Sequence, residues 1–311
     1  MNVDSSRTKA PVEGVCPVLA TPFEPTGEVD YSSFASLLDH VVAAGVRGVM
    51  YPGFASEYHK LSDLERQLAV SELLERVPKD SDFATVISVQ DHATHLAVKR
   101  AAEAAESGAS AINVLPPGFL SPSREAVHRH LVAVAKAVSP VPVIVQLAPA
   151  LNGTGLDAPA ISRLTDAAPN VVQVKVESTP PGRLISALSS QRPPVASVVG
   201  YAGVQLMDAL RRRVHGVQPG SAFVEIYSTI WQAWMDGMPS EAFQRHQRLL
   251  PYISYWMQDV ELLIAAEKRI LHRRGIIRSE YCRGPRYEFD FEEEWAIDRF
   301  LDEFQAELGG K

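Results

Sequence analysis

The stretch NVVQVKVE (residues 170–177) places one lysine among β-branched apolar residues, a pattern typical of a buried strand. Seven other short apolar runs resemble it, at residues 14–20, 47–53, 84–90, 110–116, 141–147, 194–200 and 214–220. Amphipathic stretches lie between the runs, and two of them, 32–45 and 94–108, end at a glycine as capped helices do. Strands that recur about every thirty residues between helices predict parallel βαβ units.

Eight such units without a linker favour a (β/α)8 barrel of the α/β class over residues 1–238. The competing interpretation is a doubly wound open sheet, which would carry a glycine-rich phosphate turn after its first strand. The first run is instead followed by TPFEPTGEVD (21–30), which has no such turn. From residue 239 to 311 the strand pattern stops, and 240–275 and 292–308 predict a helical extension packed on the barrel.

Composition excludes several classes of protein. The chain has 311 residues, 46% of them hydrophobic, which is enough for a large globular core. A net charge of −7 and the lack of a basic tract argue against a nucleic-acid or anionic-membrane partner. No apolar run approaches the length of a membrane span, and the first residues do not resemble a signal peptide. Cys16 and Cys282 are too few for a disulfide framework, so we expect a cytoplasmic protein. The two cysteines lack metal-site spacing, and no metal-ligand cluster or phosphate loop occurs in the sequence, so we expect no cofactor and no metal.

Lys175 is the residue of the 170–177 run that needs an explanation. In a (β/α)8 barrel the active site lies at the carboxyl ends of the strands, where every second residue points inward. Gln173, Lys175 and Glu177 share one parity, so all three point inward if Lys175 does. A buried amine that stays neutral can attack a carbonyl group to form an imine. The alternative is a strand-end lysine that extends to solvent.

Several motifs in order resemble the dihydrodipicolinate synthase/N-acetylneuraminate lyase family of pyruvate-handling barrels. Residues 21–50 are similar to the opening of the family, and PGFASEYHKLSDLER (52–66) stands where the family has its Gly-Thr-Thr-Gly-Glu loop. PPGFLSP (116–122) and VIVQLAP (143–149) match its Pro-Tyr-Tyr loop and its Tyr-Asn-Val-Pro strand end. VQVKVES (172–178) aligns with the strand of the Schiff-base lysine, so the resemblance implies that Lys175 forms the imine.

The sequence departs from this family at the residues that bind the carboxylate and relay protons. The Gly-Thr-Thr-Gly-Glu loop binds the keto-acid carboxylate in the family, and residues 53–57 of this chain, GFASE, lack both of its threonines. Backbone N–H groups of Ala55 and Ser56 and the Ser56 hydroxyl could still bind an anion. Ser56 could instead cap the loop as a turn residue. Gln146 replaces the proton-relaying tyrosine; it can hydrogen-bond a substrate oxygen or tie neighbouring strand ends together. These losses argue against the lysine-biosynthesis reaction.

Other residues could supply the missing groups. Glu177 could relay protons to a bound imine, and His92 at the end of the third run titrates near neutrality. His92 could also be a solvated residue beside a helix cap. Gln218 leaves polar groups at the end of the eighth run, before a helix expected near Ser221 whose N-terminus could receive an anion. Phe119 replaces the second tyrosine, which in the family reaches into the neighbouring subunit.

The predicted function is a class I, Schiff-base aldolase-like lyase acting on pyruvate or a longer 2-keto acid and an aldehyde. One alternative is a dehydratase that uses the same imine to expel a hydroxyl group from a sugar-acid-like 2-keto acid. Another alternative is a barrel that has lost catalysis and binds a ligand. The predicted partner is a small-molecule 2-keto acid, and the resemblance implies a homotetramer built from two dimers.

Overall fold

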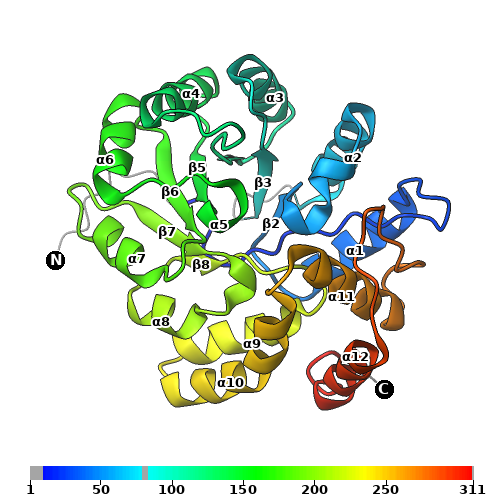
Figure 1. The fold of residues 1–311 in the computed structure, drawn as a ribbon. Coiled ribbons are helices and arrows are strands. Elements are labelled where there is room, and N and C mark those ends of the chain that lie inside the picture. The colour runs from blue at the N-terminus through cyan, green and yellow to red at the C-terminus, as the bar shows by residue number, and fades with distance from the viewer. Residues whose placement is uncertain (1–9, 79–82, 310–311) are drawn as a thin grey trace. The chain divides into compact units, whose positions relative to one another are not determined.

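A computed structural model describes residues 10–78 and 83–309 (Figure 1). A strand lies in each of the eight predicted runs: β1 Gly14–Val15, β2 Gly48–Tyr51, β3 Ala84–Val89, β4 Ala111–Val114, β5 Val143–Leu147, β6 Val171–Val176, β7 Ala196–Val199 and β8 Gly216–Val217. The α-helices are α1 Tyr31–Ala43, α2 Asp63–Arg76, α3 Thr94–Glu106, α4 Arg124–Ala137, α5 Pro149–Asn152, α6 Ala158–Ala167, α7 Gly182–Ser189, α8 Leu206–Arg211, α9 Val224–Met235, α10 Pro239–Trp256, α11 Val260–Arg273 and α12 Phe291–Glu303. This alternation is the element order of a (β/α)8 barrel.

The described residues form two compact units, and the first holds residues 10–13, 84–200 and 208–216. Strands β3 to β7 pair as parallel neighbours in chain order. Helices α3, α4, α6 and α7 lie along the outer side of these strands (Figure 1). Every residue of β4 and β5 is buried, which explains why their sequences are nearly continuous apolar runs.

Short polar side chains fix where the helices of this unit begin. The Ser123 hydroxyl accepts the Ala126 N–H at 3.2 Å, and the Asp157 carboxylate accepts the Ala160 N–H at 3.0 Å. These caps satisfy backbone donors that the first helical turn leaves free. At the C-terminal end of α3, Gly108 adopts a left-handed conformation with φ 97°, as the sequence predicted for the end of a helix.

The second unit holds residues 14–78, 83, 201–207 and 217–309. Val18 forms parallel bridges to Met50 and to Gly220, and the Cys16 N–H donates to the Val217 carbonyl at 3.0 Å. Between β2 and α2 the chain makes two short 3₁₀ turns, η1 Phe54–Ser56 and η2 Tyr58–Lys60. The second unit thus joins the chain around β1 and β2 to the C-terminal helices.

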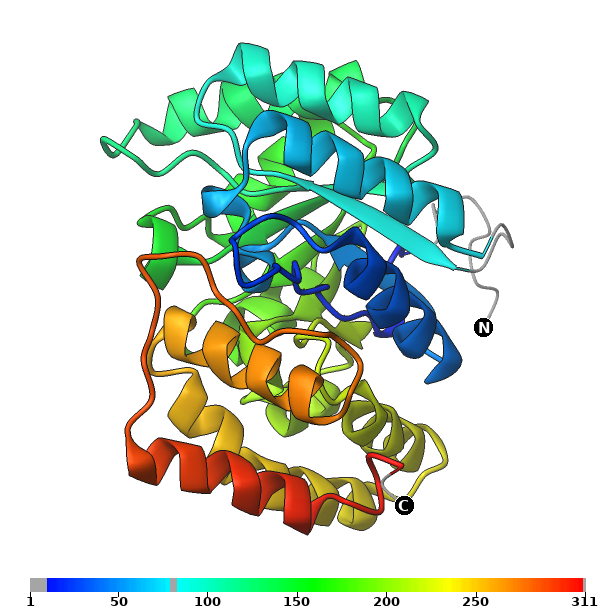
Figure 2. The same cartoon turned by 90° about the vertical axis from the view of Figure 1, so that its right-hand side faces the viewer.

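Helices α10 and α12 lie side by side at the C-terminal end, and the segment between α11 and α12 runs back along α11 (Figure 2). Phe300 of α12 packs edge-on against Trp256 of α10 and Phe223, with ring centroids 5.2 and 5.1 Å apart. The helices expected in this region are therefore present, while the boundary at residue 238 stays a prediction. Among the described residues no helix is both long and apolar enough to cross a membrane.

Candidate active site

The register of the first unit places Lys175 and Gln146 on the same face of the sheet. Gln146 of β5 pairs with Lys175 of β6, which in turn pairs with Val198 of β7. Paired residues of neighbouring strands project to the same side. Lys175 is 3% exposed, so the amine is buried with the polar residues of this face and does not extend to solvent.

Glu177 lies beside this lysine. Its Oε1 atom is 3.5 Å from the Lys175 Nζ atom, and its Oε2 atom accepts a hydrogen bond of 2.6 Å from Gln146 Nε2. A side chain at Gly200 would approach the Glu177 carboxylate to 2.2 Å, so the glycine leaves the space that the carboxylate occupies. The structure therefore brings three of the predicted catalytic residues together on one buried face.

The polar contacts continue across β4 and β3. Asn113 Nδ2 donates to Gln146 Oε1 at 2.8 Å and to Ser88 Oγ at 2.7 Å, and Gln90 Nε2 donates to Ser88 Oγ at 2.9 Å. Gln146 thus uses its oxygen toward Asn113 and its nitrogen toward Glu177, which fixes the orientation of its amide. Sequence reasoning missed Ser88 and Asn113; each is a polar residue with apolar neighbours on both sides, and that was the available signal.

His92 is not part of this polar chain. It is exposed, and its ring lies edge-on to Phe119 with centroids 5.9 Å apart. The neighbouring Asp91 forms an ion pair with Arg100. Phe119 itself is 73% exposed. The structure therefore brings His92 to the loop after β4 and does not bring it together with Lys175.

In the second unit, the Ser56 hydroxyl is used inside the predicted carboxylate loop. It donates to the Leu19 carbonyl at 2.5 Å and accepts the Gly53 N–H at 2.9 Å. The Ser56 N–H also bonds back to the Gly53 carbonyl at 3.0 Å. These contacts agree with the turn-capping alternative for Ser56, whereas Ala55 is half-buried in the same turn.

The helix after β8 begins at Val224, three residues later than the sequence suggested. The Ser221 N–H, expected near an anion site, donates to Glu267 Oε2 of α11 at 3.1 Å. Burial raises the pKa of Glu267 to about 8, although the Ser221 hydrogen bond opposes this. Gln218 is buried nearby in sequence, and its Nε2 donates to the Cys16 sulfur at 3.5 Å. The Glu267 carboxyl group thus accepts the hydrogen bond of an N–H that was predicted to lie near a substrate anion.

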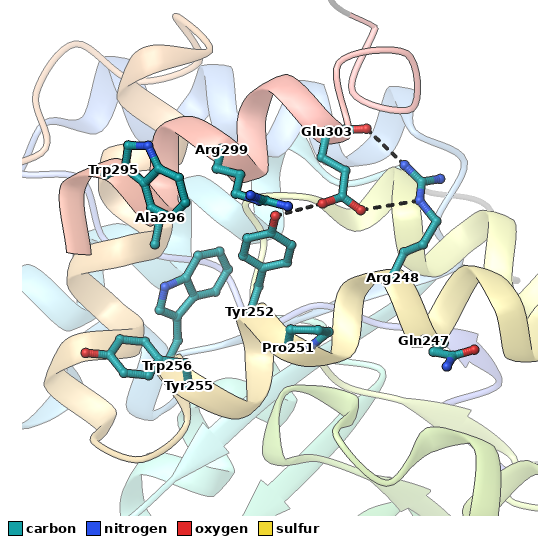
Figure 3. Close-up of a pocket in the computed structure, with 10 residues that line it drawn as sticks. All are labelled: Gln247, Arg248, Pro251, Tyr252, Tyr255, Trp256, Trp295, Ala296, Arg299 and Glu303. Carbon is teal, nitrogen blue, oxygen red and sulfur yellow. Dashed lines mark hydrogen bonds and ion pairs between the residues drawn. The ribbon is translucent and has the colours of Figure 1, made fainter. Parts of the chain in front are cut away.

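A separate groove lies between α10 and α12 (Figure 3). It encloses about 380 Å³ and has aromatic walls that include Tyr252, Trp256 and Trp295. Two of its charged residues pair with each other, because Glu303 forms an ion pair with Arg248 and also accepts a 2.8 Å hydrogen bond from the Tyr252 hydroxyl. None of the predicted site residues lines this groove. Across residues 10–78 and 83–309, no cluster of three or more metal-ligating side chains occurs.

Comparison with known proteins places the chain among relatives of one fold. The chain is 28% identical over 280 residues to the L-2-keto-3-deoxyarabonate dehydratase of Azospirillum brasilense, covering 88% of both chains. The structure of dihydrodipicolinate synthase from Rhodopseudomonas palustris superposes with a TM-score of 0.86 at 21% identity, covering 94% of this chain and 97% of that one. Escherichia coli YagE, solved in complex with pyruvate, superposes with a TM-score of 0.86 at 23% identity, covering 95% and 99%.

These structural matches confirm the predicted (β/α)8 barrel. The model of the dihydrodipicolinate synthetase family matches residues 11–303, which is nearly the whole chain. The prediction of an enzyme of the aldolase-like lyase class agrees with that match. The chain belongs to the dihydrodipicolinate synthetase family.

Proposed function

We propose that this protein is a class I aldolase-like lyase in which Lys175 forms an imine with pyruvate or a longer 2-keto acid. The observation that carries the proposal is the buried Lys175 amine, which lies 3.5 Å from the Glu177 carboxylate on the face that it shares with Gln146. A neighbouring carboxylate can exchange protons with groups attached to the imine carbon. The resemblance to the family implies a Schiff-base lysine on this strand, and Lys175 stands at that position.

The reaction follows from the chemistry of an imine. The Lys175 nitrogen attacks the C2 carbonyl carbon of the keto acid, and the carbonyl oxygen leaves as water. A base then takes the proton of the C4 hydroxyl, the C3–C4 bond breaks, and its electron pair forms a C2–C3 enamine while an aldehyde departs. The enamine takes a proton at C3, and water hydrolyses the imine to release pyruvate and the free lysine.

We propose Glu177 as the group that carries these protons. A glutamine amide does not titrate, so Gln146 cannot replace the phenol of a proton-relaying tyrosine. Its 2.6 Å hydrogen bond to Glu177 instead orients the carboxylate. The contact between Gln146 and Asn113 at 2.8 Å prevents the amide from turning away. The predicted catalytic role of Gln146 thereby becomes a positioning role, and His92 has no assigned step in this mechanism.

A dehydratase is the second candidate, and the Azospirillum relative favours it because that protein is named as a keto-deoxy sugar acid dehydratase. The same imine would lose a proton from C3, and the C4 hydroxyl would leave with a proton as water. The two candidates share Lys175 and Glu177 and differ in their products. A lyase yields pyruvate and an aldehyde, whereas a dehydratase retains the whole carbon chain.

The remaining sequence-based predictions complete this proposal. We expect Ala55 and Ser56 to contribute to binding of the keto-acid carboxylate, and Phe119 and Gln218 to contribute to the substrate site. A homotetramer and a cytoplasmic location are also proposed. The exposed Phe119 supports the homotetramer, because large apolar side chains that are exposed to water often mark a surface that binds another protein chain.

Borohydride trapping tests the imine directly. Pyruvate or a five- or six-carbon 2-keto-3-deoxy acid, followed by borohydride, should add the mass of the reduced adduct to the wild-type chain. Lys175→Ala should gain no mass, whereas the exposed-lysine control Lys99→Ala should behave as wild type. An adduct that survives in Lys175→Ala would refute the assignment. Product analysis with the keto acid that traps best then separates lyase from dehydratase.

A further inference from the structure

The loop after β2 is held by a buried group of charges that the proposed chemistry does not use. Glu57 lies between the turns η1 and η2 and is fully buried. Its Oε1 atom accepts a hydrogen bond from Lys268 of α11, which is also fully buried. Its Oε2 atom accepts from Lys60 Nζ and from the Arg283 N–H, each at 3.2 Å. We call Glu57, Lys268, Lys60 and Arg283 the Glu57 clamp.

The backbone of Glu57 needs this support. Its φ and ψ are 53° and 38°, a left-handed conformation that side chains with a Cβ atom rarely adopt. Such conformations persist where the surroundings impose them, and they concentrate at functional loops. Three donors converge on the Glu57 carboxylate and hold the residue in place. The clamp therefore sets the turn that joins Phe54–Ser56 to Tyr58–Lys60.

Lys268 and Arg283, two of the residues that bind Glu57, make further contacts of their own. Lys268 Nζ donates to the Tyr281 carbonyl at 3.0 Å and lies 4.1 Å from the centroid of the Phe23 ring. Arg283 stacks over the same ring at 4.4 Å and donates to the Lys60 carbonyl at 2.7 Å. The clamp thus connects the loop after β2 with α11 and with the segment that follows it.

Stability alone does not account for such a pair. Two charges without solvent exposure lose their hydration, and well-packed apolar residues often serve a fold as well or better. Burial does lower the pKa of Lys268, against the opposing effect of Glu57. The Glu57–Lys268 pair also holds Glu57 in its left-handed conformation. These contacts therefore maintain the conformation of the loop after β2.

We infer that Lys268 is a positioning residue, which acts through Glu57 to hold the loop Gly53–Lys60 in the conformation that binds the substrate anion. This inference rests on the proposed function, in which Ala55 and Ser56 of this loop contribute to binding of the keto-acid carboxylate. It gives helix α11 a role in substrate affinity. Loss of the clamp should therefore weaken binding of the keto acid while leaving the reactivity of a bound one intact.

The test uses Lys268→Met, Glu57→Gln and the double variant in the full-length chain, with pyruvate as the probe. We expect the pyruvate concentration for half-maximal borohydride trapping to rise about tenfold or more in all three. The extent of trapping at saturation should stay at the wild-type value. Each single variant should unfold at a lower temperature, and the double variant should recover because no unpaired charge remains buried.

Arg274→Met is the matched control. Arg274 follows α11 and pairs with Glu225, so its loss disturbs the same helix without touching Glu57. It should lower the unfolding temperature and leave pyruvate trapping unchanged. A double variant that regains wild-type pyruvate affinity along with its stability would show that the pair is only structural. An equal loss of affinity in Arg274→Met would also overturn the inference.

A second readout separates this inference from the proposed function. Hydrogen exchange at the amides of residues 53–60 should be faster in the three clamp variants than in wild type or Arg274→Met. If wild type is not trapped by any keto acid, the proposed imine chemistry fails, and the exchange data still decide whether the clamp positions the loop. Unchanged exchange in the clamp variants would overturn the inference whatever the trapping shows.

Discussion

At the scale of single residues, the candidate site depends on where one carboxylate points. Glu177 has its two oxygens directed to different partners, Lys175 at 3.5 Å and Gln146 at 2.6 Å. Gly200 leaves the space for it. The loss of the family tyrosine is thus accompanied by a carboxylate on the lysine's own face. We regard Glu177 and Gln146 as parts of one unit, in which the first carries protons and the second orients it.

The variant Glu177→Gln tests this assignment. The amide keeps the shape of the carboxylate and can still accept the Gln146 hydrogen bond, but it cannot carry a proton. Turnover should fall by about 10²–10⁴-fold, the usual contribution of a positioned acid or base. Borohydride trapping should still reach the wild-type extent at Lys175. The measurement is kcat for the best keto acid together with the trapped mass.

Gln146→Met is the companion variant for this test. It removes the hydrogen bond to Glu177 but keeps the carboxylate itself, so turnover should fall less than in Glu177→Gln. Thermal unfolding should show a cost of about 1–3 kcal/mol, because Asn113 loses a buried acceptor. Normal turnover in Glu177→Gln would refute the proton-carrying role. A larger loss of turnover in Gln146→Met than in Glu177→Gln would instead assign the proton transfer elsewhere.

At the scale of elements, the sequence located every strand because β-branched runs bounded by turn residues are a local signal. The sequence also predicted that Lys175 and Glu177 lie on one face of their strand, since the side chains of a strand alternate. It could not predict the contact of Gln146 with Glu177, because that contact depends on the register between β5 and β6. The Glu57 clamp was missed for a similar reason: Lys268 sits in an ordinary amphipathic helix, 211 residues from its partner.

The helix expected near Ser221 begins at Val224, and the Ser221 N–H binds a residue that is distant in sequence. Glu267 lies 46 residues beyond Ser221 and takes its N–H. At Gly220 a side chain would come within 2.0 Å of this carboxyl group, so the turn needs glycine for space. The Glu267 side chain of α11 is therefore buried against the turn that follows β8. No local sequence pattern predicts this contact.

The pKa of Glu267 gives a prediction for the stability of this junction. Burial raises it from 4.5 to about 8, so the folded protein holds a proton that the unfolded chain releases above pH 4.5. The stabilisation is fully present below pH 4.5 and is lost as the pH rises through about 8. Each pKa unit corresponds to about 1.4 kcal/mol. The contribution of Glu267 to the free energy of unfolding should therefore decrease by a few kcal/mol over this range.

Urea unfolding of wild type and Glu267→Gln between pH 4.5 and 8.5 measures this effect. The variant cannot ionise at this position, so its stability relative to wild type should rise steadily with pH. Subtraction of the two curves removes the other titrating groups, including Glu65 and Glu225, whose pKa values are lowered to about 2 and which lose their stabilising contribution only in acid. Parallel curves for the two proteins would mean that Glu267 is ionised throughout.

At the scale of the whole molecule, the loop after β4 presents apolar side chains on a rigid base. The Asn152 amide and the Thr154 hydroxyl donate to the carbonyls of Pro116 and Pro117, each at 2.9 Å. Beyond these anchors, Phe119 and Leu120 are 73% and 85% exposed. A fixed loop that exposes two large apolar residues is typical of a surface that binds another protein.

We expect a second copy of the chain to cover this loop within a homotetramer. Burial of a phenylalanine side chain gains about 1.5–3 kcal/mol, and a charge at its position would have to be buried unpaired. Phe119→Asp should therefore give a smaller assembly than wild type in light scattering at micromolar concentration. Leu64→Asp is the control, because Leu64 is 64% exposed on α2 and lies outside the loop. A wild-type monomer, or the same loss of mass in both variants, would contradict an assembly built on Phe119.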